Sequence, residues 1–125
     1  MDMKQQRFGI EIELTGIARK RGAEIAAAYF GTQSYYEGTY YDTYVALDSQ
    51  GREWKFMSDA SIKPERKEGK SRVAASDSYK TEMVSPICRY EGIETIQELV
   101  RKLREVGAIA NKSCGIHVHI DASPF

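Results

Sequence analysis

Apolar and polar residues alternate strictly in two segments, one near each end of the chain. Residues 7–14 read RFGIEIEL and residues 113–122 read SCGIHVHIDA. A period of two, with β-branched residues at apolar positions, predicts half-buried β-strands. The sets expected to face the core are Phe8, Ile10, Ile12 and Leu14, and then Cys114, Ile116, Val118 and Ile120. The sets expected on the opposite face are Arg7, Gly9, Glu11 and Glu13, and then Gly115, His117, His119 and Asp121.

Two other segments have the residue spacing of helices. Residues 22–30, GAEIAAAYF, combine alanines with helix-spaced apolar positions, which indicates a short helix. Residues 91–108 form the stronger pattern, because their apolar residues make one stripe and Gly107 suits a C-terminal stop. The stripe consists of Ile93, Ile96, Leu99, Val100, Leu103 and Val106.

Shorter strands are predicted in the middle of the chain. The segments YVALD (44–48) and REWKFMSD (52–59) flank Ser-Gln-Gly, which is typical of a β-hairpin. Trp54 and Phe56 share one face of the second segment, and we expect both in the core. KTEMVSP (80–86) predicts a further short strand that ends at its proline.

Two segments are expected to be loops. Residues 31–43 are rich in glycine, threonine and tyrosine, and we interpret them as an ordered loop that packs by aromatic contacts. Residues 61–79 have few apolar side chains and are long for a loop in a compact domain. We therefore expect residues 61–79 to be a flexible, functional loop.

The order of these elements is strand, helix, hairpin, strand, helix, strand. It predicts an α+β fold with a largely antiparallel sheet and helices on one face. The 125 residues suit one domain, 1–125.

Composition narrows the classes of partner. The chain has 18 Lys plus Arg and 18 Asp plus Glu, so no net charge attracts nucleic acid or an anionic membrane, and neither partner is expected. Cys88 and Cys114 form neither a close metal pair nor a disulfide framework, and we expect them to be small buried residues. No signal-like start or long apolar run is present. We therefore expect a cytoplasmic protein with reduced thiols.

Candidate chemistry lies on the polar faces of the predicted strands. The first strand carries Glu11 and Glu13, the last carries His117 and His119, and the strand at 80–86 adds Glu82. If these faces belong to one sheet, carboxylates and imidazoles converge, and a cation would relieve the repulsion between the carboxylates. Such a mixture suits Mg²⁺ or Mn²⁺ better than Zn²⁺. Each motif alone also fits an ordinary solvated face.

The motifs FGIEIEL, WKFMSDAS, TEMVSP and NKSCGIHVHID, in that order and with a helix before the last, resemble the amidoligase family. Its members are carboxylate–amine ligases related to glutamine synthetase and glutamate–cysteine ligase. The resemblance runs from Arg7 to about Asp121, and GIEIEL and SCGIHVHID are its most specific parts. It implies a glutamine synthetase-like catalytic fold, in which an antiparallel sheet holds ATP, Mg²⁺ or Mn²⁺ ions and a substrate carboxylate.

The resemblance also implies roles for individual residues. The expected metal-binding and catalytic residues are Glu11, Glu13, Glu82 and His117. His119 is expected nearer the ATP phosphates, and Asp59 and Ser61 are expected to contact phosphate or substrate. The implied reaction is ATP-dependent amide formation through an acyl phosphate, with small-molecule or peptide carboxylates and amines as substrates.

Relatives continue past the GxHxH strand, so we expect residues 1–125 to be an N-terminal portion of the catalytic domain. Weak or absent ligase activity, and a sheet edge that favours homo-oligomers, would follow. Two alternatives stay open. One is a metal-dependent hydrolase in which His117, His119 and a carboxylate activate water. The other is a non-catalytic binding module on the same scaffold.

Overall fold

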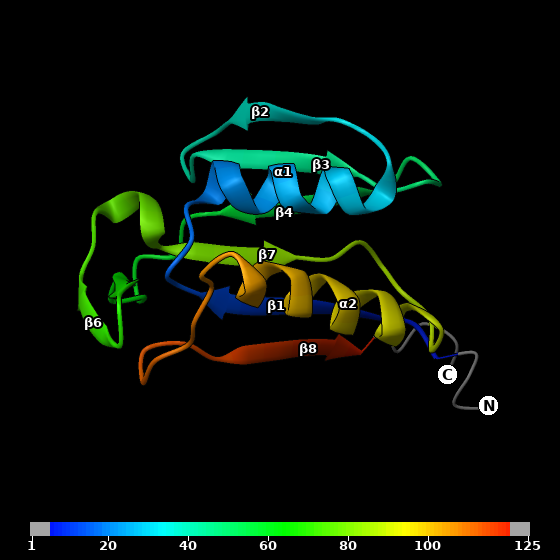
Figure 1. The fold of residues 1–125 in the computed structure, drawn as a ribbon. Helices are drawn as coiled ribbons and strands as arrows, with labels where there is room; N and C mark the ends of the chain where they lie inside the picture. The colour runs from blue at the N-terminus through cyan, green and yellow to red at the C-terminus, as the bar shows by residue number, and fades with distance from the viewer. Residues whose placement is uncertain (1–5, 121–125) are drawn as a thin grey trace.

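The computed structural model describes residues 6–120, and a six-stranded sheet in the order β2-β3-β4-β7-β1-β8 forms its frame (Figure 1). Every pairing between neighbouring strands of this sheet is antiparallel. The strands are β1 (Phe8–Leu14), β2 (Ser34–Gly38), β3 (Thr43–Leu47), β4 (Glu53–Met57), β7 (Thr81–Val84) and β8 (Ile116–Ile120). The helices are α1 (Arg19–Phe30) and α2 (Gly92–Glu105). The predicted α+β class with a largely antiparallel sheet is therefore confirmed.

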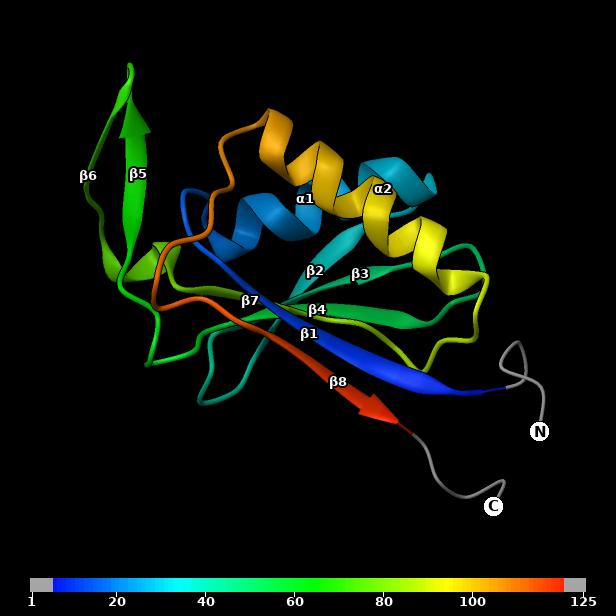
Figure 2. The ribbon, with the colours of Figure 1, turned by 90° about the horizontal axis from the view of Figure 1, so that it is seen from below.

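Both helices lie on one face of the sheet, as predicted (Figure 2). The core between the layers is apolar, and Trp54 and Phe56 are completely buried in it, as their alternation indicates. The helix α1 begins at Arg19, three residues before the predicted start, and approaches β4 closely at Gly22. A Cβ atom at Gly22 would lie 2.7 Å from Cδ2 of Phe56, so only glycine allows this contact. Within residues 6–120, no helix is long and apolar enough to cross a membrane.

The tyrosine-rich segment 31–43 is not wholly a loop, and that prediction is wrong in part. Residues 34–38 form β2, which pairs with β3. The rings of Tyr36 and Tyr44 lie 4.8 Å apart across the two strands. Tyrosine favours strands through such cross-strand contacts, which outweigh the glycine and threonine that favour a loop.

The segment 61–79 contains a hairpin and a short helix where sequence analysis predicts a loop. The hairpin consists of β5 (Glu65–Glu68) and β6 (Ser71–Ala74), and the 3₁₀ helix η2 (Asp77–Tyr79) follows it. The hairpin projects from one end of the sheet (Figure 2). Thr15 anchors its base, because the Thr15 hydroxyl donates to the Glu65 carbonyl at 3.0 Å and accepts from the Glu65 N–H at 2.9 Å. The residues of both hairpin strands are exposed or only partly buried, so no apolar face is needed and alternation is absent.

The apolar residues of β8 are exposed, although they point to the predicted side of the sheet. Ile116 lines a groove with Ile93 and Ile96 of the α2 segment, so it lies on the helix side. Ile116, Val118 and Ile120 are nevertheless 63%, 54% and 58% exposed. The expected burial is wrong because β8 is an edge strand and α2 lies over β1 (Figure 1). Cys88 is buried as expected, whereas Cys114 is only partly buried.

Candidate functional site

Three neighbouring strands, β7, β1 and β8, bring acidic and histidine side chains together on the sheet face that the helices leave open. Glu11 of β1 lies directly opposite His117 of β8, and Glu13 lies opposite Glu82 of β7. His119 lies opposite Gly9, on the same face of β8 as His117. Alternation explains this placement, because the intervening Ile12 and Met83 are buried under the helices.

Glu11 connects the carboxylates to the two imidazoles. One of its carboxyl oxygens lies 3.6 Å from Nδ1 of His117, and the other lies 3.2 Å from Nε2 of His119. All three side chains are solvent-accessible, with the imidazoles 56% and 65% exposed. Both histidines can therefore reach a ligand on the open face while they contact the same carboxylate.

Glu13 is the most deeply buried member of the cluster, at 7% exposure. Its Oε1 accepts a 2.7 Å hydrogen bond from the Gly115 N–H. Burial first, and then a hydrogen bond to Asp59, raise the pKa of Glu13 above its usual value. Of this pair, Glu13 therefore retains a proton more readily than Asp59 does.

Asp59 and Ser61 lie beside Glu13, in the segment after β4. One carboxyl oxygen of Asp59 accepts hydrogen bonds from the Ser61 N–H at 2.9 Å and from the Ser61 hydroxyl at 2.7 Å. Burial works against the ionised form of Asp59, but these bonds and the one from Glu13 outweigh it and lower the pKa of Asp59. Ser61 thus fixes the Asp59 carboxylate toward the cluster.

Glu82 carries the largest electrostatic perturbation in the cluster. Burial, a hydrogen bond to Glu11 and the negative charges of Glu11, Asp59 and Glu13 raise the pKa of Glu82 to about 8. Four carboxyl groups thus crowd one site, and without a cation they reduce their repulsion by retaining protons.

The structure therefore brings together Glu11, Glu13, Asp59, Ser61, Glu82, His117 and His119. Asp121, which sequence analysis places on the same face, lies outside the described residues. Within residues 6–120, no three histidine, cysteine, aspartate or glutamate side chains are already arranged to hold a metal ion. The carboxyl groups instead hydrogen-bond in pairs, and Glu11 contacts both imidazoles.

A cleft of about 640 Å³ opens beside the acidic cluster and includes residues that sequence analysis missed. Glu11, Asp59 and Glu82 line it together with Tyr40, Tyr41, Asp77 and Lys80. Tyr40 is 95% exposed. The Nζ of Lys80 lies 3.0 Å from the Asp77 carboxylate. These residues belong to segments predicted as loops or to a strand end. In such segments, alternation of apolar and polar residues does not predict which side of the sheet a side chain faces.

The turn that carries Tyr40 and Tyr41 is fixed by a buried arginine. Thr39 and Asp42, on either side of the two tyrosines, have positive φ angles of 66° and 50°. Arg19 is 6% exposed and binds Oδ2 of Asp42 through Nε at 3.2 Å and Nη2 at 2.8 Å. Non-glycine residues with positive φ persist only where surrounding contacts hold them. The contacts between Arg19 and Asp42 therefore hold the aromatic rim of the cleft in a fixed conformation.

The donor set fits a hard divalent cation. It offers carboxylate oxygens and imidazole nitrogens, the ligands that Mg²⁺ and Mn²⁺ accept in proteins. A cation would offset the burial and the carboxylate repulsion that raise the pKa of Glu13 and Glu82. Glu11, Glu13, Glu82 and His117 are the side chains that could turn toward one common ion.

Comparison with known proteins places this site in a family context. No curated protein and no solved structure matches the chain. The model of a family described as "Putative amidoligase enzyme" matches residues 4–125, which is nearly the whole chain. The chain therefore belongs to the amidoligase family.

Proposed function

We propose that this chain contributes the metal- and ATP-binding part of an ATP-dependent carboxylate–amine ligase. The observation that carries the proposal is the crowding of Glu11, Glu13, Asp59 and Glu82 at one site, with the pKa of Glu82 raised to about 8. Membership of the amidoligase family supports the class of reaction. We also propose that the sheet corresponds to part of a glutamine synthetase-like catalytic fold.

The roles proposed for individual residues follow from their positions. Glu11, Glu13, Glu82 and His117 would hold Mg²⁺ or Mn²⁺. When bound, these ions would neutralise charge on the ATP phosphates and orient the transferred group. His119 lies at the more exposed side of the cluster and would contact phosphate oxygens. Asp59, held by Ser61, would complete the acidic wall toward the substrate.

The proposed reaction has two steps. A carboxylate oxygen of the substrate attacks the γ-phosphorus of ATP, and ADP leaves with the electron pair of the broken bond. An amine nitrogen then attacks the acyl carbon, and inorganic phosphate leaves. The acidic cleft would favour a cationic amine by attraction and would accept the proton that the amine loses.

The substrate would occupy the cleft of about 640 Å³ beside the cluster. Its rim is aromatic at Tyr40 and Tyr41 and charged at Asp77 and Lys80. Aromatic faces attract cations and flat groups, and a carboxylate pairs with an ammonium group. These features suit an amine-bearing substrate, or a flat group, next to the phosphate-transfer site.

The test is a calorimetric titration of Mn²⁺ into the chain, with and without a nonhydrolysable ATP analogue. We expect Mn²⁺ binding that Glu82→Gln weakens strongly. Glutamine can still donate a hydrogen bond to Glu11, so the metal-free geometry survives while the ligand charge is lost. The control is Glu24→Gln, because Glu24 is exposed on α1, away from the cluster. Absence of Mn²⁺ binding, or equal binding by both variants, would refute the proposal.

A further inference from the structure

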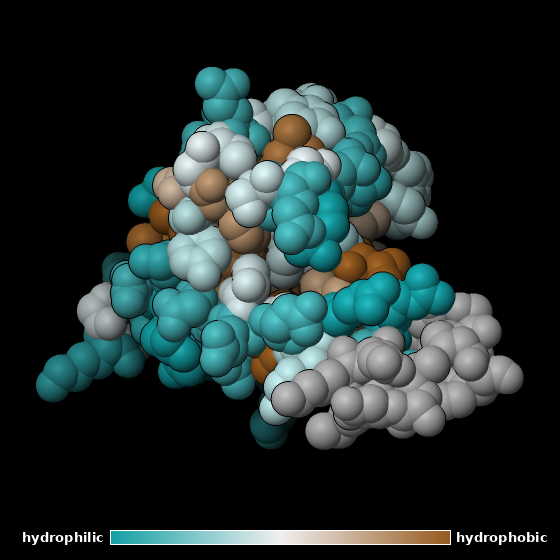
Figure 3. Space-filling view, turned by 90° about the vertical axis from the view of Figure 1, so that its right-hand side faces the viewer, coloured by the Kyte–Doolittle hydropathy of each residue, from teal (hydrophilic) through white to brown (hydrophobic). Residues whose placement is uncertain are grey.

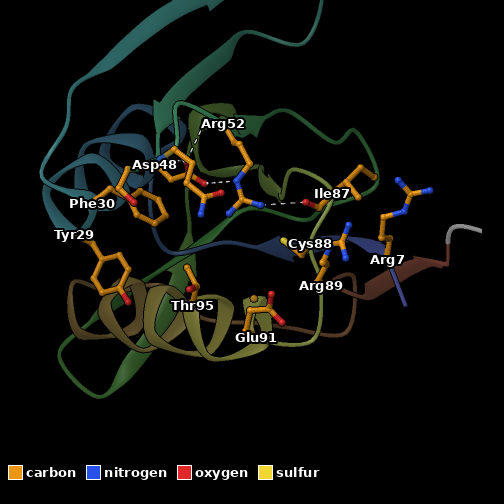
Figure 4. Close-up of a pocket in the computed structure, with 13 residues that line it drawn as sticks. Arg7, Tyr29, Phe30, Asp48, Arg52, Ile87, Cys88, Arg89, Glu91 and Thr95 are labelled. Carbon is orange, nitrogen blue, oxygen red and sulfur yellow. Dashed lines mark hydrogen bonds and ion pairs between the residues drawn. The ribbon is translucent and has the colours of Figure 1, made fainter. Parts of the chain in front are cut away.

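A second cavity, of about 690 Å³, lies at the end of the molecule where α1 ends and α2 begins (Figure 4). Among the described residues, none lines both this cavity and the acidic cleft. Its walls come from the start of β1, the turn between β3 and β4, and the segment between β7 and α2. Figure 3 looks onto this end of the molecule, where apolar patches lie among strongly hydrophilic residues.

Three arginines line this cavity: Arg7, Arg52 and Arg89. Arg7 and Arg89 are brought together by an antiparallel bridge between Phe8 and Cys88. The Phe8 N–H donates to the Cys88 carbonyl at 2.9 Å, and the Cys88 N–H donates to the Phe8 carbonyl at 2.7 Å. Because the bridge is antiparallel, the next residue on one side, Arg7, lies across from the next residue on the other, Arg89.

Arg52 is held at the cavity wall by contacts that use only part of its guanidinium. Its Nε donates to Oδ2 of Asp48 at 2.9 Å, and its Nη1 donates to the Ile87 carbonyl at 3.3 Å (Figure 4). A guanidinium has five N–H donors in a planar fork, so donors remain for a ligand. The side chain is 41% exposed, which leaves the fork accessible from the cavity.

Two carboxylates, Asp48 and Glu91, also line the cavity and offset part of its positive charge. Asp48 is 5% exposed, and its carboxylate also accepts hydrogen bonds from the Trp54 indole and from the N–H groups of Gln50 and Arg52. Its lone pairs are therefore engaged within the fold. Glu91 is exposed at the rim. Among the described residues that line the cavity, three arginines therefore outnumber two carboxylates, and this excess of positive charge favours an anion.

The rest of the lining combines aromatic and apolar residues with the polar residues Ser49, Gln50 and Thr95. Tyr29 and Phe30 lie at the α1 end of the cavity, with ring centroids 5.2 Å apart in an edge-to-face pair. Cys88 lies between them and Arg7, and burial raises the pKa of its thiol, so the thiol stays neutral. The cavity therefore offers guanidinium donors and an aromatic wall at one end. These are the features of a binding site.

We propose that this cavity binds a small organic phosphate, independently of the acidic site. Arg52 and Arg89 hold the phosphate oxygens, with Arg7 at the same end, and an aromatic ring of the ligand packs against Tyr29 and Phe30. Guanidinium forks match phosphate oxygens in bidentate geometry, and a phosphate monoester carries the negative charge that the excess of arginine attracts. This site would be a second, metal-independent ligand site in addition to the proposed ligase centre.

The test uses phenyl phosphate as the probe, followed by calorimetry or NMR in the presence of EDTA, so that no metal ion contributes. We expect saturable binding that Arg89→Gln weakens about tenfold, the usual effect of losing a charged hydrogen-bond donor. Arg89 is exposed, and within residues 6–120 no hydrogen bond or ion pair of its side chain is observed, so the variant should fold normally. The matched control is Arg21→Gln, which removes an equal charge from the exposed surface of α1 and should leave binding unchanged.

Two further comparisons make the result decisive. Inorganic phosphate should bind more weakly than phenyl phosphate, because it lacks the ring that packs on Tyr29 and Phe30. Glu82→Gln should bind phenyl phosphate as the unaltered chain does, because the acidic cluster lies elsewhere. Absent binding, equal weakening by Arg89→Gln and Arg21→Gln, or equal affinity for the two probes would overturn the proposal.

Discussion

The indole N–H of Trp54 donates a 3.0 Å hydrogen bond to Oδ2 of Asp48, and both side chains are buried. Asp48 ends the β3 side of the β3–β4 turn, and Trp54 lies in the core below it. The same carboxylate receives Nε of Arg52 at 2.9 Å. The Asp48 carboxylate therefore connects the hairpin turn, the core and the arginine-lined cavity.

This arrangement predicts how the stability of the chain depends on acid. Burial disfavours ionised Asp48, but the hydrogen bonds from Trp54, Arg52 and Gln50 outweigh it and lower the pKa of Asp48. A depressed folded-state pKa adds stability above the unfolded value, about 3.8, and that stability is lost as the pH falls through the folded value. We therefore expect the urea midpoint to drop below about pH 4.

Asp48→Asn isolates this contribution. The variant should lose about 1–3 kcal/mol of unfolding free energy at pH 7, because asparagine offers a weaker acceptor to Trp54 and Arg52. Its urea midpoint should also fall less between pH 5 and pH 3 than that of the unaltered chain. Parallel pH profiles for the two proteins would show that Asp48 is not the titrating group.

The second prediction concerns Arg19, a buried cation that joins three segments. It binds Asp42, and its Nη1 donates to the carbonyls of Asp77 at 3.0 Å and Lys80 at 2.8 Å. Arg19→Met should cost about 3–5 kcal/mol, as expected when one partner of a buried charge network is removed. Denaturant unfolding measures the loss.

Asp42→Asn is the matched control, because asparagine keeps an oxygen acceptor for Arg19 while the carbonyls of Asp77 and Lys80 still accept from it. Its cost should be clearly smaller than that of Arg19→Met. If the two variants are equally destabilised, the carbonyl contacts of Arg19 to Asp77 and Lys80 contribute little.

The third prediction separates the metal ligands from the fold. Glu13→Gln keeps an acceptor for the Gly115 N–H and a donor for Asp59, so the metal-free structure should retain its stability. Mn²⁺ affinity should fall by at least about tenfold, since even the loss of outer-shell partners of a metal commonly costs that much. Calorimetry gives the affinity, and thermal unfolding in EDTA gives the stability. Unchanged Mn²⁺ affinity would remove Glu13 from the ligand set.

The fold and the candidate site differ in how far the sequence predicts them. Alternation in residues 7–14 and 113–122 predicts the facing of Glu11, Glu13, His117 and His119, because side-chain direction is a local property of a strand. The pairing of β1 with both β7 and β8 follows from the assembled sheet, and no single segment encodes it. Tyr40, Tyr41 and Arg19 were missed for the same reason: their roles arise from contacts between segments distant in the sequence.

The exposed residues of β8 show most clearly that alternation alone does not predict burial, and they give the last prediction. Alternation indicates which side Ile116 faces, but its burial depends on whether a helix lies above it. Ile116 is 63% exposed, so Ile116→Asp should cost no more than about 1 kcal/mol, the range of strand propensity at a surface position. Leu99→Ala, at a fully buried position of α2, should cost about 2–5 kcal/mol. Urea unfolding of both variants compares the two positions directly. A large loss of stability in Ile116→Asp would show that the helix-side face of β8 is covered in solution, for instance by a second copy of the chain. In that case the variant should also change the oligomeric state in sedimentation measurements.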